Sequence, residues 1–230
     1  MIMYHFSYDL AYFGLFDVGF FRSGIGLNAA RLIGGSFIFL AGLSLTLSYR
    51  RALRRAPGRS LLFWKYFARG LRIFSYGLVI TFLTWIFLPN EMILFGILHM
   101  IGISIILTYP FLNLKLPNVA LGIACIVLGI LLRGLDVHNS WLVWLGTHPT
   151  FFMPDYWPIF PWFGVMLLGV AAGNALYRDR RKQAAHATQR PRVIRPLAFL
   201  GRHSLTVYLV HQPILLAALV LLGVGDSGLL

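Results

Sequence analysis

The stretch RLIGGSFIFLAGLSLTLSYRRALRRAPGR, residues 31–59, decides the class of fold. After Arg31, the next eighteen residues carry no charge, and the ten that follow carry five arginines. A helix that spans the hydrocarbon core of a bilayer needs about 20 mostly apolar residues. The stretch therefore predicts a transmembrane helix that ends in a strongly basic loop.

The rest of the chain has the same character. It has 230 residues, of which 58% are hydrophobic and only 12% are charged, and its mean hydropathy is +0.75. Soluble domains have about a quarter of their residues charged, so we expect a polytopic membrane protein. The basic residues that give the net charge of +13 lie mostly between the apolar runs. We attribute it to membrane topology, not to nucleic-acid binding. Cys125 is the single cysteine, which excludes an internal disulfide.

Seven apolar segments are long enough, or nearly long enough, to span a membrane. They cover residues 1–16, 24–49, 62–88, 92–111, 119–132, 160–177 and 197–224. The first is short for a span. We therefore predict an all-α fold: a polytopic transmembrane helical bundle of about seven helices, with the first helix truncated. The whole chain, 1–230, is expected to be one transmembrane domain.

The basic residues predict the orientation. Of the twenty Lys and Arg residues, eight lie between the second and third segments, one between the fourth and fifth, and eight around the link between the sixth and seventh. Loops rich in Lys and Arg stay in the cytoplasm. We expect the loops around Ala56, Lys115 and Gln183 to be cytoplasmic and the loop around Thr150 to be exterior. The N-terminus would then be cytoplasmic and the C-terminus exterior.

One exterior stretch, residues 134–164, lacks Lys and Arg and is rich in aromatic residues and proline. Aromatic belts are common where membrane helices meet the interface. Aromatic faces also suit sugar rings, so the alternative is the wall of a substrate site. In that second interpretation Asp155, Trp157 and Trp162 would shape the acceptor side.

Three histidines fall at similar predicted depths in the bilayer. At a rise of about 1.5 Å per residue, His99 lies about 12 Å and His5 about 18 Å below the outer surface, and His211 about 22 Å above the inner one. A single buried histidine is usually a neutral ring that is hydrogen-bonded between helices. Three in one slab, with Asp9 and Glu91 as nearby carboxylates, favour a polar cavity instead.

The spacing of His5 and Asp9 suits acid–base chemistry. Residues four apart share one face of a helix, and a carboxylate beside a histidine orients the ring as a general base. A metal site is the competing use. The histidines lack the spacing of a helical zinc motif, so we predict no metal.

The cytoplasmic cations have two interpretations. Arg50, Arg51 and their neighbours up to Arg59 are best explained by topology or by anionic lipid headgroups. The residues Lys65, Arg69 and Arg72 form one stripe that enters the third segment, and such a stripe could hold a polyphosphate. Arg202, at the inner end of the seventh segment, could add to it.

Four motifs resemble a known family. MIMYHFSYDL, FGILHMIGISIIL, DYWPIFPWFGVMLLGVAAGNALY and LAFLGRHSLTVYLVHQPILL are similar, in order and spacing, to the bacterial branch of the heparan-alpha-glucosaminide N-acetyltransferase catalytic-domain family. That family belongs to a wider group of polytopic acyltransferases. The resemblance implies a helical membrane fold and an acyl-CoA donor on the cytoplasmic side. It also implies an acceptor, often a sugar amine or hydroxyl, on the far side.

The chain departs from that family in two places. Relatives usually carry a charged stretch and an apolar run before the YH motif, whereas this chain starts inside the first helix. We therefore expect an upstream extension of about ten or more residues, enough to complete a span. The animal members are thought to use a histidine just after the first segment, but residues 11–31 contain none. The catalytic assignment falls back on His5, His99 and His211.

These observations together predict an acyl-CoA-dependent acyltransferase of the bacterial inner membrane. The base and its orienter would come from His5, Asp9, His99 and His211. The donor, acetyl-CoA, would be held by Arg69, Arg72 and Arg202. The acceptor, a glycan or amino sugar, would meet Asp155, Trp157, Trp162 and Gln212. The expected partners are the lipid bilayer and a second copy in a homodimer, without nucleic acid. The alternative is a small proton-coupled transporter or a non-catalytic membrane subunit, since buried His and Asp also form proton relays.

Overall fold

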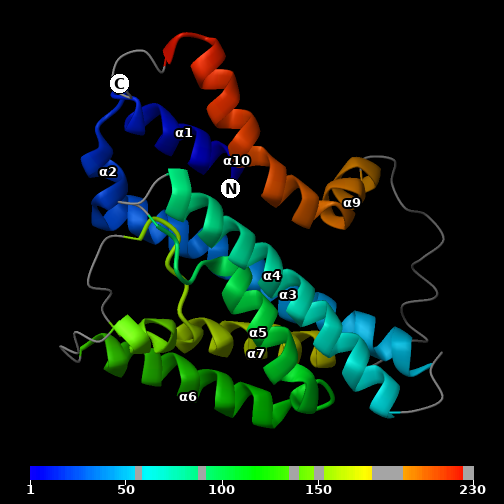
Figure 1. Cartoon of the computed structure of the whole chain (residues 1–230). Helices are drawn as coiled ribbons and strands as arrows, with labels where there is room; N and C mark the ends of the chain where they lie inside the picture. Colours follow the sequence, from blue (N-terminus) through cyan, green and yellow to red (C-terminus); the bar gives the residue numbers. More distant parts are fainter. Residues whose placement is uncertain (55–58, 88–91, 135–139, 148–152, 178–193, 225–230) are drawn as a thin grey trace. The chain divides into compact units, whose positions relative to one another are not determined.

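The computed structural model describes residues 1–54, 59–87, 92–134, 140–147, 153–177 and 194–224, and these are helical with short connections and no strand (Figure 1). The helices are α1 (Ile2–Tyr12), α2 (Val18–Arg22), α3 (Gly24–Leu53), α4 (Arg59–Phe87), α5 (Ile97–Thr108), η2 (Tyr109–Phe111), α6 (Leu116–Arg133), η3 (Ser140–Leu145), α7 (Ile159–Leu176), α9 (Ile194–Arg202) and α10 (Ser204–Leu221).

Five helices of the described part of the chain are long and apolar enough to cross a membrane: α3, α4, α6, α7 and α10. They correspond to five of the seven predicted segments. The other two segments contain the shorter helices α1 and α5. The prediction of an all-α, polytopic helical bundle is confirmed.

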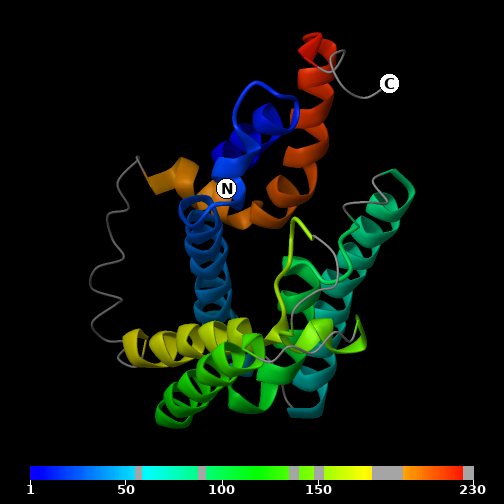
Figure 2. The same ribbon diagram turned by 90° about the vertical axis from the view of Figure 1, so that its left-hand side faces the viewer.

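The chain forms two compact units. A terminal unit consists of Met1–Gly34 and Asp179–Leu230, and a central unit consists of Gly35–Arg178. In the central unit α6 packs along α7, and α4 packs along α5. Both pairs run side by side in two perpendicular views (Figures 1 and 2). In the terminal unit α1 packs against α10. The expectation of one domain over residues 1–230 stays a prediction.

Glycines bring the central helices together at backbone distance. A Cβ built on Gly70 of α4 would lie 2.6 Å from the carbonyl oxygen of Gly102 on α5, and one built on Gly102 would lie 2.8 Å from the carbonyl oxygen of Gly70. Gly122 of α6 and Gly164 of α7 meet in the same reciprocal way. Small residues at helix contacts are typical of membrane proteins, in which association depends on close packing.

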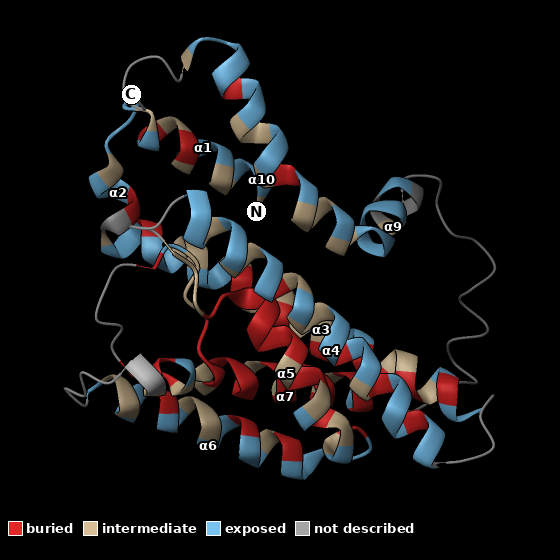
Figure 3. Ribbon diagram, viewed as in Figure 1, coloured by how far each residue is buried: buried red, intermediate tan, exposed pale blue. Residues whose placement is uncertain are grey.

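Burial in the central unit is concentrated on α5 and α7 (Figure 3). By contrast, α4 and α6 expose large apolar side chains, including Phe82, Trp85, Ile123 and Ile130. An apolar face of that kind suits contact with lipid tails. In the central unit, α5 and α7 are therefore the buried helices. The exposed apolar faces of α4 and α6 are suited to contact with lipid.

Polar side chains fasten one end of the central unit. Arg50 of α3 donates to the carbonyl of Tyr177 and, at 2.9 Å, to Oδ1 of Asn174. The amide of Asn174 donates to the carbonyls of Leu112 and Leu114, each at 2.8 Å. These carbonyls follow the last turns of helices and lack helical partners. The Leu114 carbonyl also accepts from Nδ2 of Asn118 at 2.7 Å, so the arginine and the two asparagines together pair the polar groups at this end of the unit.

Two predicted segments differ from the helices that form. The first was expected over residues 1–16, but α1 ends at Tyr12. The fourth was expected from residue 92, but α5 begins only at Ile97, with Gly96 in extended conformation as its N-cap. The depth estimates for His5 and His99 assumed a continuous helical rise to the outer surface. They do not hold, because the rise of 1.5 Å per residue applies only within a helix.

The seventh predicted segment, residues 197–224, is two helices. α9 ends at Arg202 and α10 begins at Ser204, with His203 between them. The ring Nδ1 of His203 lies 3.0 Å from the carbonyl oxygen of Phe199, and its backbone N–H donates to the same oxygen. Gly201, a weak helix former, precedes the break. The depth estimate for His211, counted from Pro196 through this break, fails for the same reason.

Candidate functional site

The terminal unit holds the densest group of buried polar side chains that the sequence singled out. Asp9 on α1 is 3% exposed and His211 on α10 is 8% exposed. The amide nitrogen of Gln212 donates to Oδ1 of Asp9 at 2.6 Å. The rings of His5 and His211 lie 5.0 Å apart, edge to face. Because His5 and Asp9 are one turn apart, two neighbouring residues of α10 contact one face of α1.

The backbone fixes the protonation pattern of His211. Its Nδ1 lies within hydrogen-bond distance of the carbonyl oxygen of Tyr208. A carbonyl only accepts, so Nδ1 carries the proton and donates it. In the neutral ring, Nε2 is then an acceptor with a free lone pair. That nitrogen is buried and has no hydrogen-bond partner among the described residues.

Three buried atoms of this group are unsatisfied in the described structure: Oδ2 of Asp9, Nε2 of His211 and Oε1 of Gln212. All three are acceptors, since the Gln212 nitrogen already donates to Asp9. An unpaired polar atom in the interior costs free energy, and buried groups of this kind often serve a ligand or a reaction. The arrangement suits a molecule that brings N–H or O–H donors.

Asp9 does not pair with His5 through a hydrogen bond in this arrangement. One of its oxygens receives the Gln212 amide, and the other has no partner in the part of the chain that the structure describes. The i, i+4 spacing places both side chains on one face, as expected, but their contacts cross to α10. Gln212, predicted to touch the acceptor, is therefore the residue that holds the carboxylate.

His99 has a different environment, in the central unit. It is 2% exposed, and its Nδ1 accepts the backbone N–H of Gly96 at 3.2 Å. Its Nε2 lies 3.4 Å from the hydroxyl of Thr81, which donates at 2.6 Å to the carbonyl of Ile93. With Nδ1 accepting, Nε2 carries the proton and donates to Thr81. Both ring nitrogens are occupied.

Asp155, Trp157 and Trp162 lie near this end of α5. Oδ2 of Asp155 accepts the N–H of Ile97 at 3.1 Å, a bond that suits a carboxylate at a helix N-terminus. The rings of Trp157 and Trp162 are 4.5 Å apart, and both are buried, at 9% and 8% exposed. Nε1 of Trp162 is buried without a partner among the described residues. The three residues predicted for the acceptor thus form a packed wall beside the helix end.

Tyr156 anchors the same wall. Its hydroxyl lies 2.7 Å from the carbonyl oxygens of both Val143 and Thr147. Burial raises the pKa of Tyr156 to about 12, against a smaller opposing effect of Arg133. The phenol is therefore a neutral donor at physiological pH.

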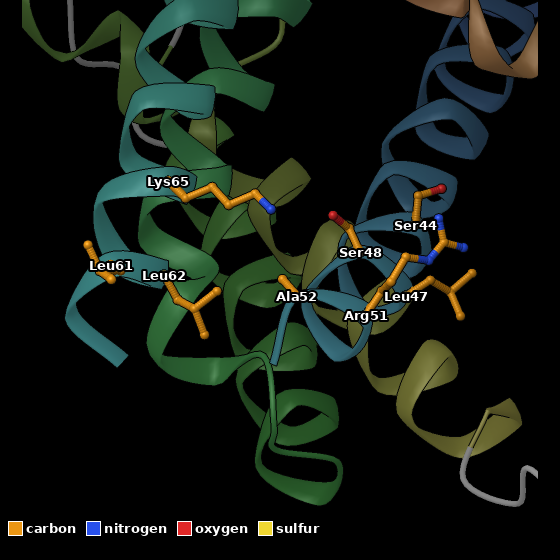
Figure 4. A pocket seen from close by; sticks show the side chains of 8 residues that line it. All are labelled: Ser44, Leu47, Ser48, Arg51, Ala52, Leu61, Leu62 and Lys65. Carbon is orange, nitrogen blue, oxygen red and sulfur yellow. The ribbon is translucent and has the colours of Figure 1, made fainter. Parts of the chain in front are cut away.

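The cations predicted to hold the donor lie in different units. Arg69 and Arg72 are exposed on α4, whereas Arg202 is exposed at the end of α9. A pocket of about 490 Å³ opens instead between the end of α3 and the start of α4 (Figure 4). It is lined by Ser44, Leu47, Ser48, Arg51, Ala52, Leu61, Leu62 and Lys65. Of the predicted stripe, only Lys65 reaches it.

The described residues contain no group of three or more His, Cys, Asp or Glu side chains that could hold a metal ion. The rings of His5 and His211 contact each other directly, whereas Asp9 is held by the neighbouring residue Gln212.

Sequence reasoning missed several residues that shape these sites. Thr81 completes the contacts of His99 and Ser48 lines the pocket, but each is one of several Ser and Thr residues in an apolar helix, and its side chain gives no distinguishing signal. The carbonyl of Tyr208, which fixes the tautomer of His211, leaves no trace in the side-chain pattern. Arg51 was assigned to topology because it lies in a run of arginines. Only the packing of α3 against α4 shows that Arg51, unlike the neighbouring arginines that the structure describes, lines the pocket.

The fold defines a multi-pass membrane protein, since its described helices include five of spanning length. The family model described as "Heparan-alpha-glucosaminide N-acetyltransferase, catalytic" matches residues 1–213. The chain belongs to that family, which implies a membrane acetyltransferase. No curated protein matches the chain, and no solved structure matches it either.

Proposed function

We propose that the protein transfers an acyl group, normally acetyl, from acyl-CoA to an amine or hydroxyl of a sugar. The observation that carries this proposal is the buried, unpartnered Nε2 of His211, whose other nitrogen is held by the Tyr208 carbonyl. A ring with a fixed tautomer and a free lone pair is suited to act as a general base. Membership of an acetyltransferase family makes acyl transfer the reaction that needs such a base.

In the proposed reaction, the acceptor's N–H or O–H donates to Nε2 of His211. The acceptor atom attacks the thioester carbonyl as the proton passes to His211, so a C–N or C–O bond forms. The C–S bond then breaks, and the leaving CoA thiolate takes the proton from His211 to become the thiol, which returns the His211 ring to its neutral form. Asp9 and Gln212 supply the two other unsatisfied acceptors for the remaining donors of the substrate. The edge-to-face contact of His5 with the His211 ring would help to orient that ring.

This mechanism ranks the predicted catalytic residues. His211 is the proposed base, and His5 and Asp9 support it. His99 has both nitrogens occupied by the protein, so we assign it the role of holding the start of α5. Asp155, Trp157 and Trp162 remain candidates for contact with the acceptor. Loss of a general base typically lowers the rate by about 10² to 10⁴.

The sidedness of the reaction is also a proposal. The distribution of Lys and Arg supports a bacterial inner-membrane protein with a cytoplasmic N-terminus and an exterior C-terminus. Acyl-CoA would then arrive from the cytoplasm and the acceptor from outside. Association as a homodimer stays a proposal.

The test is transfer of radiolabelled acetyl from acetyl-CoA to a panel of amino sugars and neutral sugars, with the purified protein in nanodiscs. We expect turnover that falls at least 100-fold in His211→Ala and less in His203→Ala, a histidine that is exposed on the same chain segment. A proton-coupled transporter would give no transfer with any acceptor and would move protons in liposomes. Equal turnover in both variants would show that His211 is not the base.

A further inference from the structure

The pocket between α3 and α4 is cationic without an internal counterion. Arg51 and Lys65 line it from opposite helices, and its other six lining residues are serine or apolar (Figure 4). The two helices also supply no acidic residue that could neutralise these cations. No Asp or Glu occurs between Asp17 and Glu91, so neither of the two helices that form the pocket carries an acid.

Two cations facing one pocket repel each other, and this repulsion is offset when an anion lies between them. Since α3 and α4 supply no carboxylate, an anion that neutralises the pocket would come from outside these helices. The pocket's volume of about 490 Å³ falls in the range of small-molecule sites, about 300–1,000 Å³. It is therefore large enough for more than a single ion.

A neutral donor is built into the same wall. The hydroxyl of Tyr66, a residue only 1% exposed, donates to Oγ of Ser48 at 3.1 Å. Because Ser48 accepts that bond, its own O–H is left to donate elsewhere. Lys and Arg with a hydroxyl donor are a combination that binds phosphate oxygens.

We propose that this pocket binds the phosphates of a ligand through Arg51, Lys65 and Ser48. The inference rests on the proposed function for the identity of that ligand, which is then the pyrophosphate and 3′-phosphate of acyl-CoA. The headgroup of an anionic lipid offers the same chemistry and is the other source. The assignment replaces Arg69 and Arg72 as the main donor contacts. It also gives Arg51 a role in ligand binding, whereas the sequence alone explained it by membrane topology or lipid headgroups.

The experiment measures binding of coenzyme A to the full chain in nanodiscs of neutral phosphatidylcholine, by isothermal calorimetry. The variants are Arg51→Gln, Lys65→Gln and Ser48→Ala. The matched controls are Arg54→Gln, in the turn that follows α3, and Arg69→Gln on α4, which change exposed cations outside the pocket. We expect Kd to rise about tenfold in Arg51→Gln and Lys65→Gln, as for loss of one charge-assisted bond. It should rise less than threefold in the controls.

A second arm separates the two phosphate sources. Fluorescent phosphatidylglycerol is titrated into the same nanodiscs, with and without coenzyme A. Binding of the lipid, but not of coenzyme A, that depends on Arg51 and Lys65 would support the phosphate pocket with a lipid as its ligand. If neither probe responds to these two residues more than to Arg54 and Arg69, the inference is overturned. Arg51-dependent binding without transfer to any acceptor would refute the proposed function and leave the pocket standing.

Discussion

Replacing His99 with alanine should destabilise the protein rather than merely inactivate it. The ring is 2% exposed and accepts the Gly96 N–H. The rings of Phe74 and Phe95 contact it at centroid distances of 5.1 and 5.6 Å. Leaving a buried N–H unpaired costs about 1–3 kcal/mol, and emptying a core site of similar size costs about 2–5 kcal/mol. We expect a loss of about 3 kcal/mol or more in the free energy of unfolding.

The assay is equilibrium unfolding in mixed dodecylmaltoside and SDS micelles, followed by circular dichroism. His99→Asn is the informative companion, since its shorter side chain can still accept the Gly96 N–H and should recover about 1 kcal/mol. Thr81→Val removes only the contact with Nε2 and the bond to the Ile93 carbonyl. It should cost about 1 kcal/mol. Wild-type stability in His99→Ala, together with a fall in transfer of 100-fold or more, would refute this reasoning and identify His99 as the base.

Four further outcomes are expected. Asn174→Ala leaves the Leu112 carbonyl without its amide donor and removes one of the two amide donors of the Leu114 carbonyl, the other being Asn118. It should cost about 1–3 kcal/mol in the same unfolding assay, whereas Asn113→Ala, whose amide donates to the Tyr49 hydroxyl at 3.3 Å, should cost less. Gly102→Val forces a side chain against the Gly70 carbonyl and should cost about 1–3 kcal/mol; wild-type stability would show that α4 and α5 do not pack this closely. The pKa of Tyr156 is raised from 10.0 to about 12, so the folded state keeps its proton longer than the unfolded chain. Its contribution should be complete below pH 10 and disappear as pH rises toward 12, and Tyr156→Phe should abolish that part of the alkaline loss of stability. On a Cys125→Ser background, cysteines placed at Ala56 and Thr150, both outside the described residues, should be labelled from outside intact cells only at Thr150, and the opposite pattern would contradict the predicted topology.

Most of the fold could be predicted from the hydrophobicity of the sequence. Each long helix is an apolar run that lipid or a neighbouring helix must cover, so α3, α4, α6, α7 and α10 could be recognised from composition alone. The start of α5 could not. Residues 92–96 are as apolar as the helix that follows, and the helix begins at Ile97 because Gly96 and the side chains of His99 and Asp155 meet there. Such a contact joins residues 58 positions apart and leaves no periodicity.

The candidate site was predictable in its residue types but not in its contacts. His5 and Asp9 could be placed on one face of α1, and His211 could be grouped with them as a buried ionisable residue. Which residue holds Asp9 depends on how α1 meets α10, and nothing in either helix alone selects Gln212. The basic pocket could not be predicted from the sequence for a similar reason. Arg51 and Arg54 are indistinguishable in sequence, but Arg51 lies in the last turn of α3 and lines the cavity, whereas Arg54 lies beyond the end of the helix and does not.

The packing of His99 against α4 has a consequence for how this family can vary. A Cβ on Gly77 would lie 2.8 Å from Nδ1 and 2.9 Å from Cε1 of the His99 ring. The two positions, 22 residues apart, therefore share one small volume, and a gain at one requires a loss at the other. Relatives that carry alanine or serine at the position of Gly77 should carry a residue smaller than histidine at that of His99. Covariation between the two columns would record this contact across the family.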